Sequence, residues 1–393
     1  MDRPGRHEVR PPGAFGKLVC AFRKQRGWTQ QELAERWGFS REYVSLVELG
    51  KRRLYGEEQV LRLAEILDIP LERLAAIGRY VPRPSPMPAE DREAEDALLQ
   101  ALLEPARTTV KLSWLVWYAN SDPSVVRDLM GIVARLESAV GGRRGKLRAA
   151  ALEMLAYAHE MLGKVAFDKL DYPDALTHFR EMHDLGAELG DPDIVALALI
   201  HRADLVRRQG RYDVALKWLA AADPAARRGR LQTAGTRWQT LARAHTDFGN
   251  RPAFLEAIMK AHEHVAALPP AAEGSNNDFT ALEVLQEQAH GHALLGEPEK
   301  ALEIYVESER RVAFRPIRDQ GNFAILRAQA YAHGGYVDEG VELAIEGLRL
   351  TGQYDSRRHA TRVRRMYDRL SGTPVGKHPR MADLRGALEA RGI

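Results

Sequence analysis

The chain has only one cysteine, so it cannot build a cysteine-based metal site. Proton transfer or metal binding would therefore depend on histidine, aspartate and glutamate. Their spacing favours neither activity. His262 and His264 are two residues apart, as are His290 and His292, and residues two apart do not face each other on a helix. No HExxH, GxxxxGK[ST] or GxGxxG motif occurs. We therefore expect a protein that is not an enzyme, with no catalytic residues, no metal and no cofactor.

Positive charge is concentrated at the N-terminal end of the chain. The formal net charge is only +3, but residues 3–53 hold 12 basic and 5 acidic residues. Residues 1–84 hold 16 and 11, which leaves 41 and 43 for the remainder. A local positive excess favours a polyanionic partner. No signal peptide and no run of about eighteen apolar residues is visible, so we expect a cytoplasmic protein with no membrane span.

The elements that carry these charges are predicted to be helices throughout, because no segment shows the alternating pattern of a strand. Four alternate prolines between positions 82 and 88 favour an extended spacer. The fold class is therefore all-α, with a boundary at the prolines. The predicted segments are an N-terminal arm (1–14), a helical domain (15–78), a proline-rich linker (79–93), an effector and dimerisation domain (94–370) and a C-terminal tail with a short helix (371–393).

The N-terminal domain carries the most specific pattern, and we predict five short helices in it. Thr29-Gln30-Gln31-Glu32 has the sequence of a capping box at a helix start. Ala34, Gly38 and Val44 have the spacing of a helix-turn-helix motif, with a small residue at the crossing, a glycine in the turn and an anchor in the core. The stretch WTQQELAERWGFSREYVSLVELGKR closely resembles the DNA-binding domain of the Xre/Cro-type phage-repressor family.

This resemblance implies double-stranded DNA as a partner, with the second helix of the motif in the major groove. It implies that Arg41, Glu42 and Ser45 read bases, since arginine can bind guanine through two hydrogen bonds and glutamate can accept one from cytosine. The side chains implied to contact the DNA backbone are Gln30, Tyr43, Lys51 and Arg52. For each residue the alternative is a solvated surface side chain. A homodimer is expected, because one such domain makes few base contacts.

The region after the linker contains five related helix pairs. Small residues of the first helices recur at Gly163, Ala203, Ala242, Ala289 and Ala328, and the turns follow seven residues later at Leu170, Gly210, Gly249, Gly296 and Gly335. This spacing resembles the tetratricopeptide repeat, although Leu170 replaces a turn glycine and Phe254 replaces a small residue. The resemblance implies an α-solenoid whose first helices line a concave face. The alternative is a generic helical bundle.

A helix-turn-helix domain joined to such repeats resembles the RRNPP group of peptide-sensing regulators, which act in quorum sensing. The resemblance implies a short peptide effector in the concave groove that alters DNA binding. The residues that it places in this groove are Tyr157, Glu160, Lys164, Phe167, Asp204, Arg207, Gln239, Arg243, Gln286, His290, Asn322 and Gln329.

Other interpretations of the second region stay open. The groove can be a solvated face without a ligand, or the repeats can dock a folded protein partner, so that the protein is an adaptor localised on DNA. An enzyme would need a convergent acid–base or metal cluster, which the sequence does not show. The basic segment SRRHATRVRRMYDRL near the C-terminus is interpreted as a solvated terminal helix, with contact to DNA or to acidic neighbours as the alternative.

Overall fold

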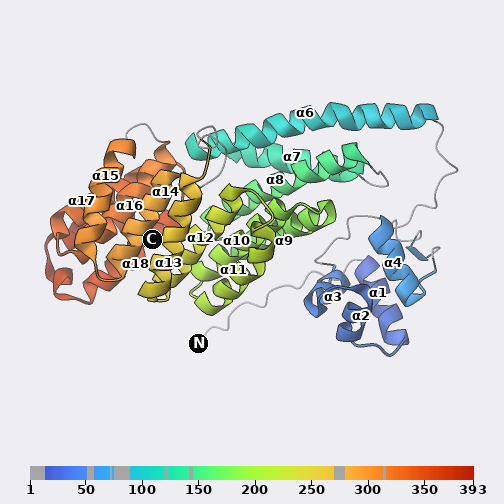
Figure 1. Ribbon diagram of the computed structural model, residues 1–393, viewed down its shortest axis with the longest axis horizontal. Coiled ribbons are helices and arrows are strands. Elements are labelled where there is room, and N and C mark those ends of the chain that lie inside the picture. Colours follow the sequence, from blue (N-terminus) through green and yellow to red (C-terminus); the bar gives the residue numbers. More distant parts are fainter. Residues whose placement is uncertain are drawn as a thin grey trace. The chain divides into compact units, whose positions relative to one another are not determined.

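The computed structural model describes residues 14–50, 57–70, 73–74, 89–119, 123–140, 145–269, 279–312 and 316–393. Every regular element in these ranges is helical, and none of them is a β-strand, which confirms the all-α prediction. The chain divides into two compact units, Met1–Gln100 with Glu137–Arg148 and Ala101–Leu136 with Ala149–Ile393 (Figure 1). Only residue 14 of the predicted arm is described, and only the helical residues 89–93 of the predicted linker.

The N-terminal part of the first unit is built from short helices. Their bounds are α1 (Ala14–Gln25), α2 (Gln30–Trp37), α3 (Arg41–Glu48) and α4 (Glu57–Leu67). Of the fifth predicted helix, 71–77, only residues 73 and 74 are described, and both are helical.

Local hydrogen bonds begin and end α2 and α3 as the sequence predicts. The Thr29 hydroxyl accepts from the Glu32 amide, and the Glu32 carboxylate accepts from the Thr29 amide at 2.7 Å. Gly38 ends α2 with a φ of 82°, a conformation that a residue with a Cβ rarely adopts. The Ser40 hydroxyl then accepts from the Tyr43 amide and begins α3. These caps fix the angle between the two helices of the motif.

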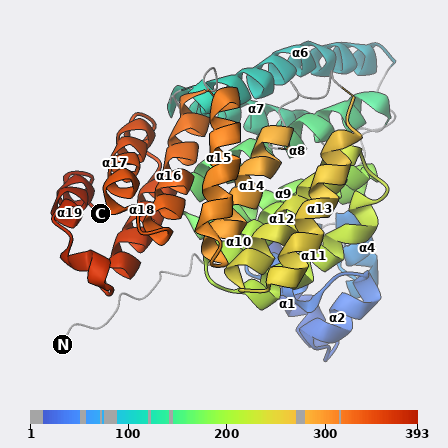
Figure 2. The ribbon, with the colours of Figure 1, turned by 60° about the vertical axis from the view of Figure 1, so that its left-hand side comes forward.

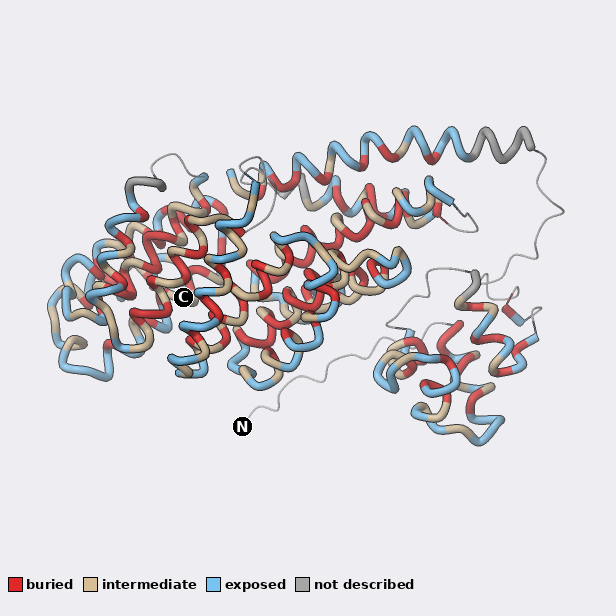
Figure 3. The backbone as a smooth tube through the Cα atoms, in the orientation of Figure 1, coloured by how far each residue is buried: buried red, intermediate tan, exposed pale blue. Residues whose placement is uncertain are grey.

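An apolar core holds α1 to α4 together (Figure 3). Ala34, Trp37 and Val44 are buried in it, so the spacing that predicts the motif also supplies its packing. Gly16 lets α1 approach α3 closely, because a Cβ at this position would lie 2.4 Å from the carbonyl oxygen of Glu48. The helix-turn-helix arrangement therefore follows from local caps and a small buried core.

The rest of the chain consists of longer helices. Their bounds are α6 (Ala89–Ala119), α7 (Pro123–Val140), α8 (Lys146–Asp168), α9 (Tyr172–Leu189), α10 (Pro192–Arg208), α11 (Tyr212–Ala226), α12 (Leu231–Asp247), α13 (Arg251–Ala266), α14 (Ala281–Leu294), α15 (Pro298–Val312), α16 (Ile317–His333), α17 (Val337–Gly352), α18 (Arg357–Ser371), the 3₁₀ helix η2 (Pro374–Lys377) and α19 (Arg380–Ala390).

Five predicted turns join the helix pairs from α8 to α17. All five adopt the left-handed conformation, with φ of 64° at Leu170, 78° at Gly210, 75° at Gly249, 87° at Gly296 and 85° at Gly335. At Leu170 this conformation costs roughly 1–2 kcal/mol, since a Cβ is present. The repeat register predicted from the sequence is therefore confirmed, and the turn geometry persists where glycine is absent.

Glycines on neighbouring helices make room for the large side chains of the repeats. A Cβ at Gly163 of α8 would lie 2.5 Å from the Phe179 ring of α9. Phe254 of α13 occupies a position where the other repeats have a small residue, and a Cβ at Gly291 of α14 would lie 2.2 Å from its ring. The departure at Phe254 is thus compensated in the next repeat.

The first helices of successive pairs form one continuous row. Helix α10 packs against α12, α12 against α14, α14 against α16, and α16 against α18. Each second helix packs against its own first helix and against the next pair, as the helices from α11 to α15 show in Figure 2. This is the helical repeat solenoid that the sequence predicts.

The two ends of the row meet at Asp168, the last residue of α8. Its carboxylate accepts hydrogen bonds from the Ser356 hydroxyl at 2.8 Å and from Arg358 at 3.1 Å, and it pairs with Arg318 at 3.1 Å. Residues 188 and 190 positions apart are thereby in direct contact. The repeats consequently curve far enough to bring the first pair against α18.

The interpretation of α18 as a solvated helix is wrong for part of its basic face. One side of α18 is buried against α16, α17 and α19, and two of its arginines, Arg358 and Arg362, line a cavity. Arg364 and Arg365 are exposed. Helix α19, in the predicted tail, adds Met381, Leu384 and Leu388 to the same core.

Candidate functional site

Helix α3 presents the predicted base-reading residues at and near its first turn. Arg41 and Glu42 are exposed, and Ser45 is half-buried. Tyr43 is half-buried, with its ring stacked on Phe39 at a centroid distance of 4.3 Å. The predicted backbone contacts Lys51 and Arg52 lie outside the described residues. The geometry therefore leaves Arg41 and Glu42 open to a ligand, while Tyr43 also stabilises the start of α3.

A buried ion pair that the sequence pattern did not predict joins α1 to α3. Arg23 donates to both carboxylate oxygens of Glu48, at 2.5 and 2.9 Å, and to the Trp28 carbonyl at 2.6 Å. Gln30, a predicted phosphate contact, donates to Glu48 at 2.8 Å. Burial raises the pKa of the Glu48 carboxyl, but the hydrogen bonds from Arg23 and Gln30 lower it more, so it lies below its usual value. The network fixes α1, α2 and α3 relative to one another.

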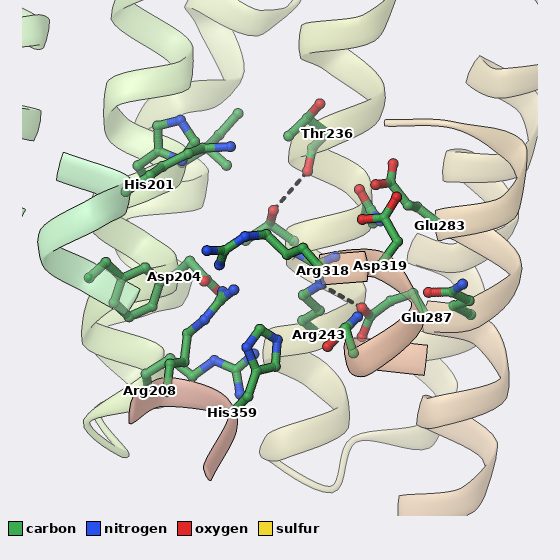
Figure 4. Close-up of a pocket in the computed structure, with 18 of the residues that line it drawn as sticks. His201, Asp204, Arg208, Thr236, Arg243, Glu283, Glu287, Arg318, Asp319 and His359 are labelled. Carbon is green, nitrogen blue, oxygen red and sulfur yellow. Dashed lines mark hydrogen bonds and ion pairs between the residues drawn. The ribbon is translucent and has the colours of Figure 1, made fainter. Parts of the chain in front are cut away.

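A cavity of about 180 Å³ opens on the row of first helices in the second unit (Figure 4). Side chains from the first helices α8, α10, α12, α14 and α16, together with α6, α9 and α18, line it. The predicted groove residues that line this cavity are Lys164, Phe167, Asp204, Gln239, Arg243, Gln286 and Asn322. Residues from separate repeats therefore converge on one site.

The remaining predicted groove residues are not part of the cavity lining; they are Tyr157, Glu160, Arg207, His290 and Gln329. Glu160 is joined to His201 by a hydrogen bond of 2.9 Å. Arg207 is buried and pairs with Asp204 at 2.6 Å and with Asp247. Gln329 is also buried. Glu160 and Arg207 thus support residues that line the cavity.

Charged pairs organise the wall of the cavity. Arg243 donates to Glu287 at 2.5 Å. Burial raises the pKa of Asp204, but Arg207, Arg208 and Arg243 lower it more, so that it lies well below its usual value. Asp204 is therefore a carboxylate at neutral pH, and its charge is neutralised by Arg207.

The cavity also contains residues that the repeat pattern did not predict. Trp117 and Tyr118 come from α6, and Arg358, His359 and Arg362 come from α18. Arg318 of α16 donates to the Trp117 carbonyl at 2.8 Å and lies over the Trp117 ring. The residues of α6 precede the repeats, and those of α18 reach the cavity because the solenoid curves. Neither group can be assigned to the cavity from the sequence of a single repeat.

No group of three or more His, Cys, Asp or Glu side chains within the described ranges is arranged to hold a metal ion. None of the helices in the described ranges has the length and apolarity needed to cross a membrane.

Residues 14–77 match the family model described as "Helix-turn-helix domain". The match confirms the predicted helix-turn-helix domain at the N-terminal end of the chain. A particular solved structure is also similar to the chain, the crystal structure of Bacillus thuringiensis PlcR in complex with the peptide PapR7 and DNA. The sequence identity is 14%, the match covers 72% of this chain and 99% of that chain, and the TM-score is 0.29. A search of curated proteins found no match.

Proposed function

We propose that the protein is a cytoplasmic, sequence-specific transcription regulator, not an enzyme, whose tetratricopeptide-like repeats bind a short peptide effector that alters DNA binding. The observation that carries the proposal is the cavity on the row of first helices. Gln239, Gln286 and Asn322, from three successive first helices, line it. Amide side chains both donate and accept hydrogen bonds, as an extended peptide backbone requires. Phe167 and Trp117 add apolar surface for side chains.

The curved geometry of the row of first helices favours a small effector over a folded protein partner in this cavity. Asp168 joins the first repeat to Ser356 and Arg358 of α18, so the row of first helices is curved around the cavity. A folded domain needs a wide, open surface of about 800 Å² per partner. Native mass spectrometry of the purified protein tests this point. A bound mass below about 2 kDa that is lost on denaturation supports the peptide proposal, whereas a stoichiometric folded protein supports the adaptor.

Arg41 provides the test of DNA reading. We expect Arg41→Ala to weaken binding to the selected operator by about 1–3 kcal/mol, or roughly 5- to 150-fold, because a bidentate contact to a base is lost. The operator is first selected from a random duplex library with the wild-type protein, and both proteins are then titrated by fluorescence anisotropy. Arg385→Ala removes the same charge from an exposed position in α19 and serves as the control. Equal operator affinity of wild type and Arg41→Ala would exclude Arg41 as a base reader.

We also propose that the protein binds DNA as a homodimer through the apolar surface of α6 and α7. Leu112 and Leu115 are 52% and 55% exposed on α6, and Met130 is 60% exposed on α7. Leu112 and Leu115 are three residues apart, so they share a helix face. Burial of such side chains stabilises association by about 1.5–3 kcal/mol each.

Replacing both leucines with aspartate is expected to convert the dimer to a monomer, because two charges would have to be buried in the interface. Sedimentation velocity measures the change. Leu231→Asp, at a 46% exposed position on α12, is the matched control and should leave the dimer intact. A dimer that persists in the double variant would place the interface elsewhere.

A further inference from the structure

The wall of the cavity carries more positive than negative groups. Six cationic side chains line it: Lys164, Arg208, Arg243, Arg318, Arg358 and Arg362. Four carboxylates line it: Asp204, Glu283, Glu287 and Asp319. Figure 4 shows Arg208 at one end of the cavity and Glu283 and Asp319 at the other. Asp204 lies beside Arg208, and Arg318 lies beside Asp319 (Figure 4), so each end of the cavity holds charges of both signs.

Most of the cationic groups already have partners. Arg243 is paired with Glu287, and the Lys164 ammonium lies 4.7 Å from the centre of the Trp114 ring. Arg318 and Arg358 share the single carboxylate of Asp168. The nearest acid to Arg208 in sequence, Asp204, is held by Arg207 through two hydrogen bonds, at 2.6 and 2.8 Å. The carboxylates of Asp168, Asp204 and Glu287 are thus occupied.

Two guanidinium groups remain without a carboxylate among the described residues. The Nε of Arg208 is buried and has no hydrogen-bond acceptor there. Arg362 donates at 3.0 Å to the amide oxygen of Asn322, a neutral group. Burial lowers the pKa of both arginines; repulsion from Arg362 lowers that of Arg208 further, and repulsion from Arg358 lowers that of Arg362 further. The pKa of Arg362 is lowered to about 10. Both side chains are half-buried, and a cation that is partly removed from water and has no anion is unfavourable, so this end of the cavity favours a negative charge.

Two histidines beside these arginines respond to the same positive potential. Burial lowers the pKa of His359, and Arg358 and Arg362 lower it further. Burial likewise lowers the pKa of His290, and Arg362 and Arg208 add to the effect. Both imidazoles are consequently neutral at pH 7, and they do not add to the repulsion that an anion must overcome.

We propose that Arg208, Arg358 and Arg362 form an anion-binding subsite for the carboxylate or phosphate group of the effector. Arg358 and Arg362 are four residues apart and lie on one face of α18, and Arg208 ends α10. Guanidinium groups bind both anions through paired, charge-assisted hydrogen bonds. The subsite rests on the proposed effector function. For a peptide it favours the C-terminal carboxylate at the arginines.

The test uses the full-length protein and two probes. Inorganic phosphate is titrated while the melting temperature is followed at low ionic strength. Random heptapeptide pools, one with free and one with amidated C-termini, are compared by affinity-selection mass spectrometry. The variants are Arg208→Gln and Arg362→Gln. The control is Arg364→Gln, at an exposed position on the same helix that pairs with Asp368 at 2.8 Å.

We expect free-acid peptides to be retained over amidated ones, and each test variant to lose about tenfold in affinity for them, while the control binds as wild type does. Without ligand, the test variants should melt at or above the wild-type temperature, because a half-buried charge that has no carboxylate partner is removed. A lower melting temperature without ligand would make the two arginines structural and overturn the subsite.

The phosphate titration and the peptide selection together distinguish an error in the proposed subsite from an error in the proposed peptide effector. Equal retention of free and amidated peptides by wild type and variants overturns the subsite and leaves the peptide proposal intact. Stabilisation by phosphate that the variants lose, with no peptide retained, supports the subsite and refutes the peptide. Absence of any binding in both arms refutes the two proposals together.

Discussion

Replacing Glu48 with alanine is expected to destabilise the helix-turn-helix domain by about 3–5 kcal/mol, because Arg23 would remain buried without its counter-charge. The side chains of Arg23 and Glu48 are only 9% and 5% exposed. Gln30 would also lose its acceptor. A small domain has about 5–15 kcal/mol of stability in total, so the variant should populate unfolded α1 to α3 and lose operator binding. Hydrogen exchange of peptides from α1 to α3, measured by mass spectrometry in the full-length protein, reports this local loss.

The effect of Glu48 is expected to depend on pH. The pKa of Glu48 in the folded protein is below its usual value. The free energy by which Glu48 stabilises the domain is therefore fully present at pH values above the unfolded-state pKa of Glu48. It is lost as the pH falls through the folded-state pKa. The difference in exchange between wild type and Glu48→Ala should therefore be largest at neutral pH and shrink in acid.

Glu35→Ala is the matched control for Glu48. Glu35 is exposed on α2, where it accepts a hydrogen bond from Gln31 at 2.9 Å. Surface pairs of this kind contribute little, about 0–1 kcal/mol. Equal exchange in wild type, Glu35→Ala and Glu48→Ala would show that the buried pair contributes nothing to the domain.

The features that the sequence predicts correctly are those set by a few neighbouring residues. Thr29 and Glu32 cap α2 because their side chains reach amides three residues away. Gly38 and the repeat glycines mark turns because only a residue without a Cβ adopts a positive φ without strain. The burial of Arg23 and Glu48 could also have been predicted from the sequence. Each residue lies four positions after a buried valine of its helix, Val19 or Val44, so both occupy a core face.

The parts of the cavity that escaped prediction depend on contacts between distant segments. The repeat register places Asp204, Gln239 and Asn322 on first helices, so these could be assigned one repeat at a time. Arg362 and Trp117 reach the cavity only because small rotations between repeats add up over the array. The same holds for Gly291, whose role depends on Phe254 of the preceding pair. A sequence pattern contains no measure of these accumulated rotations.

Replacing Asp168 with alanine is expected to release α18 from α8. The Asp168 carboxylate is 4% exposed and holds Arg318, Arg358 and Ser356. Its removal leaves two guanidinium groups without an anion, at a cost of about 3–5 kcal/mol. For a domain of this size the melting temperature should fall by roughly 10 °C. Calorimetry measures the fall, and hydrogen exchange in α18 and α19 shows where the structure opens.

Asp213→Ala is the control, because Asp213 is 70% exposed on α11 and pairs with Lys217 at 3.9 Å. The pattern of exchange decides between two accounts of the closure. Faster exchange confined to α18 and α19 would mean that Asp168 only holds α18 in place, since α10 to α16 would keep their own contacts. Faster exchange along the whole row would mean that closure stabilises every repeat. An unchanged melting temperature in Asp168→Ala would refute both, and the curvature would then have to come from packing between neighbouring repeats alone.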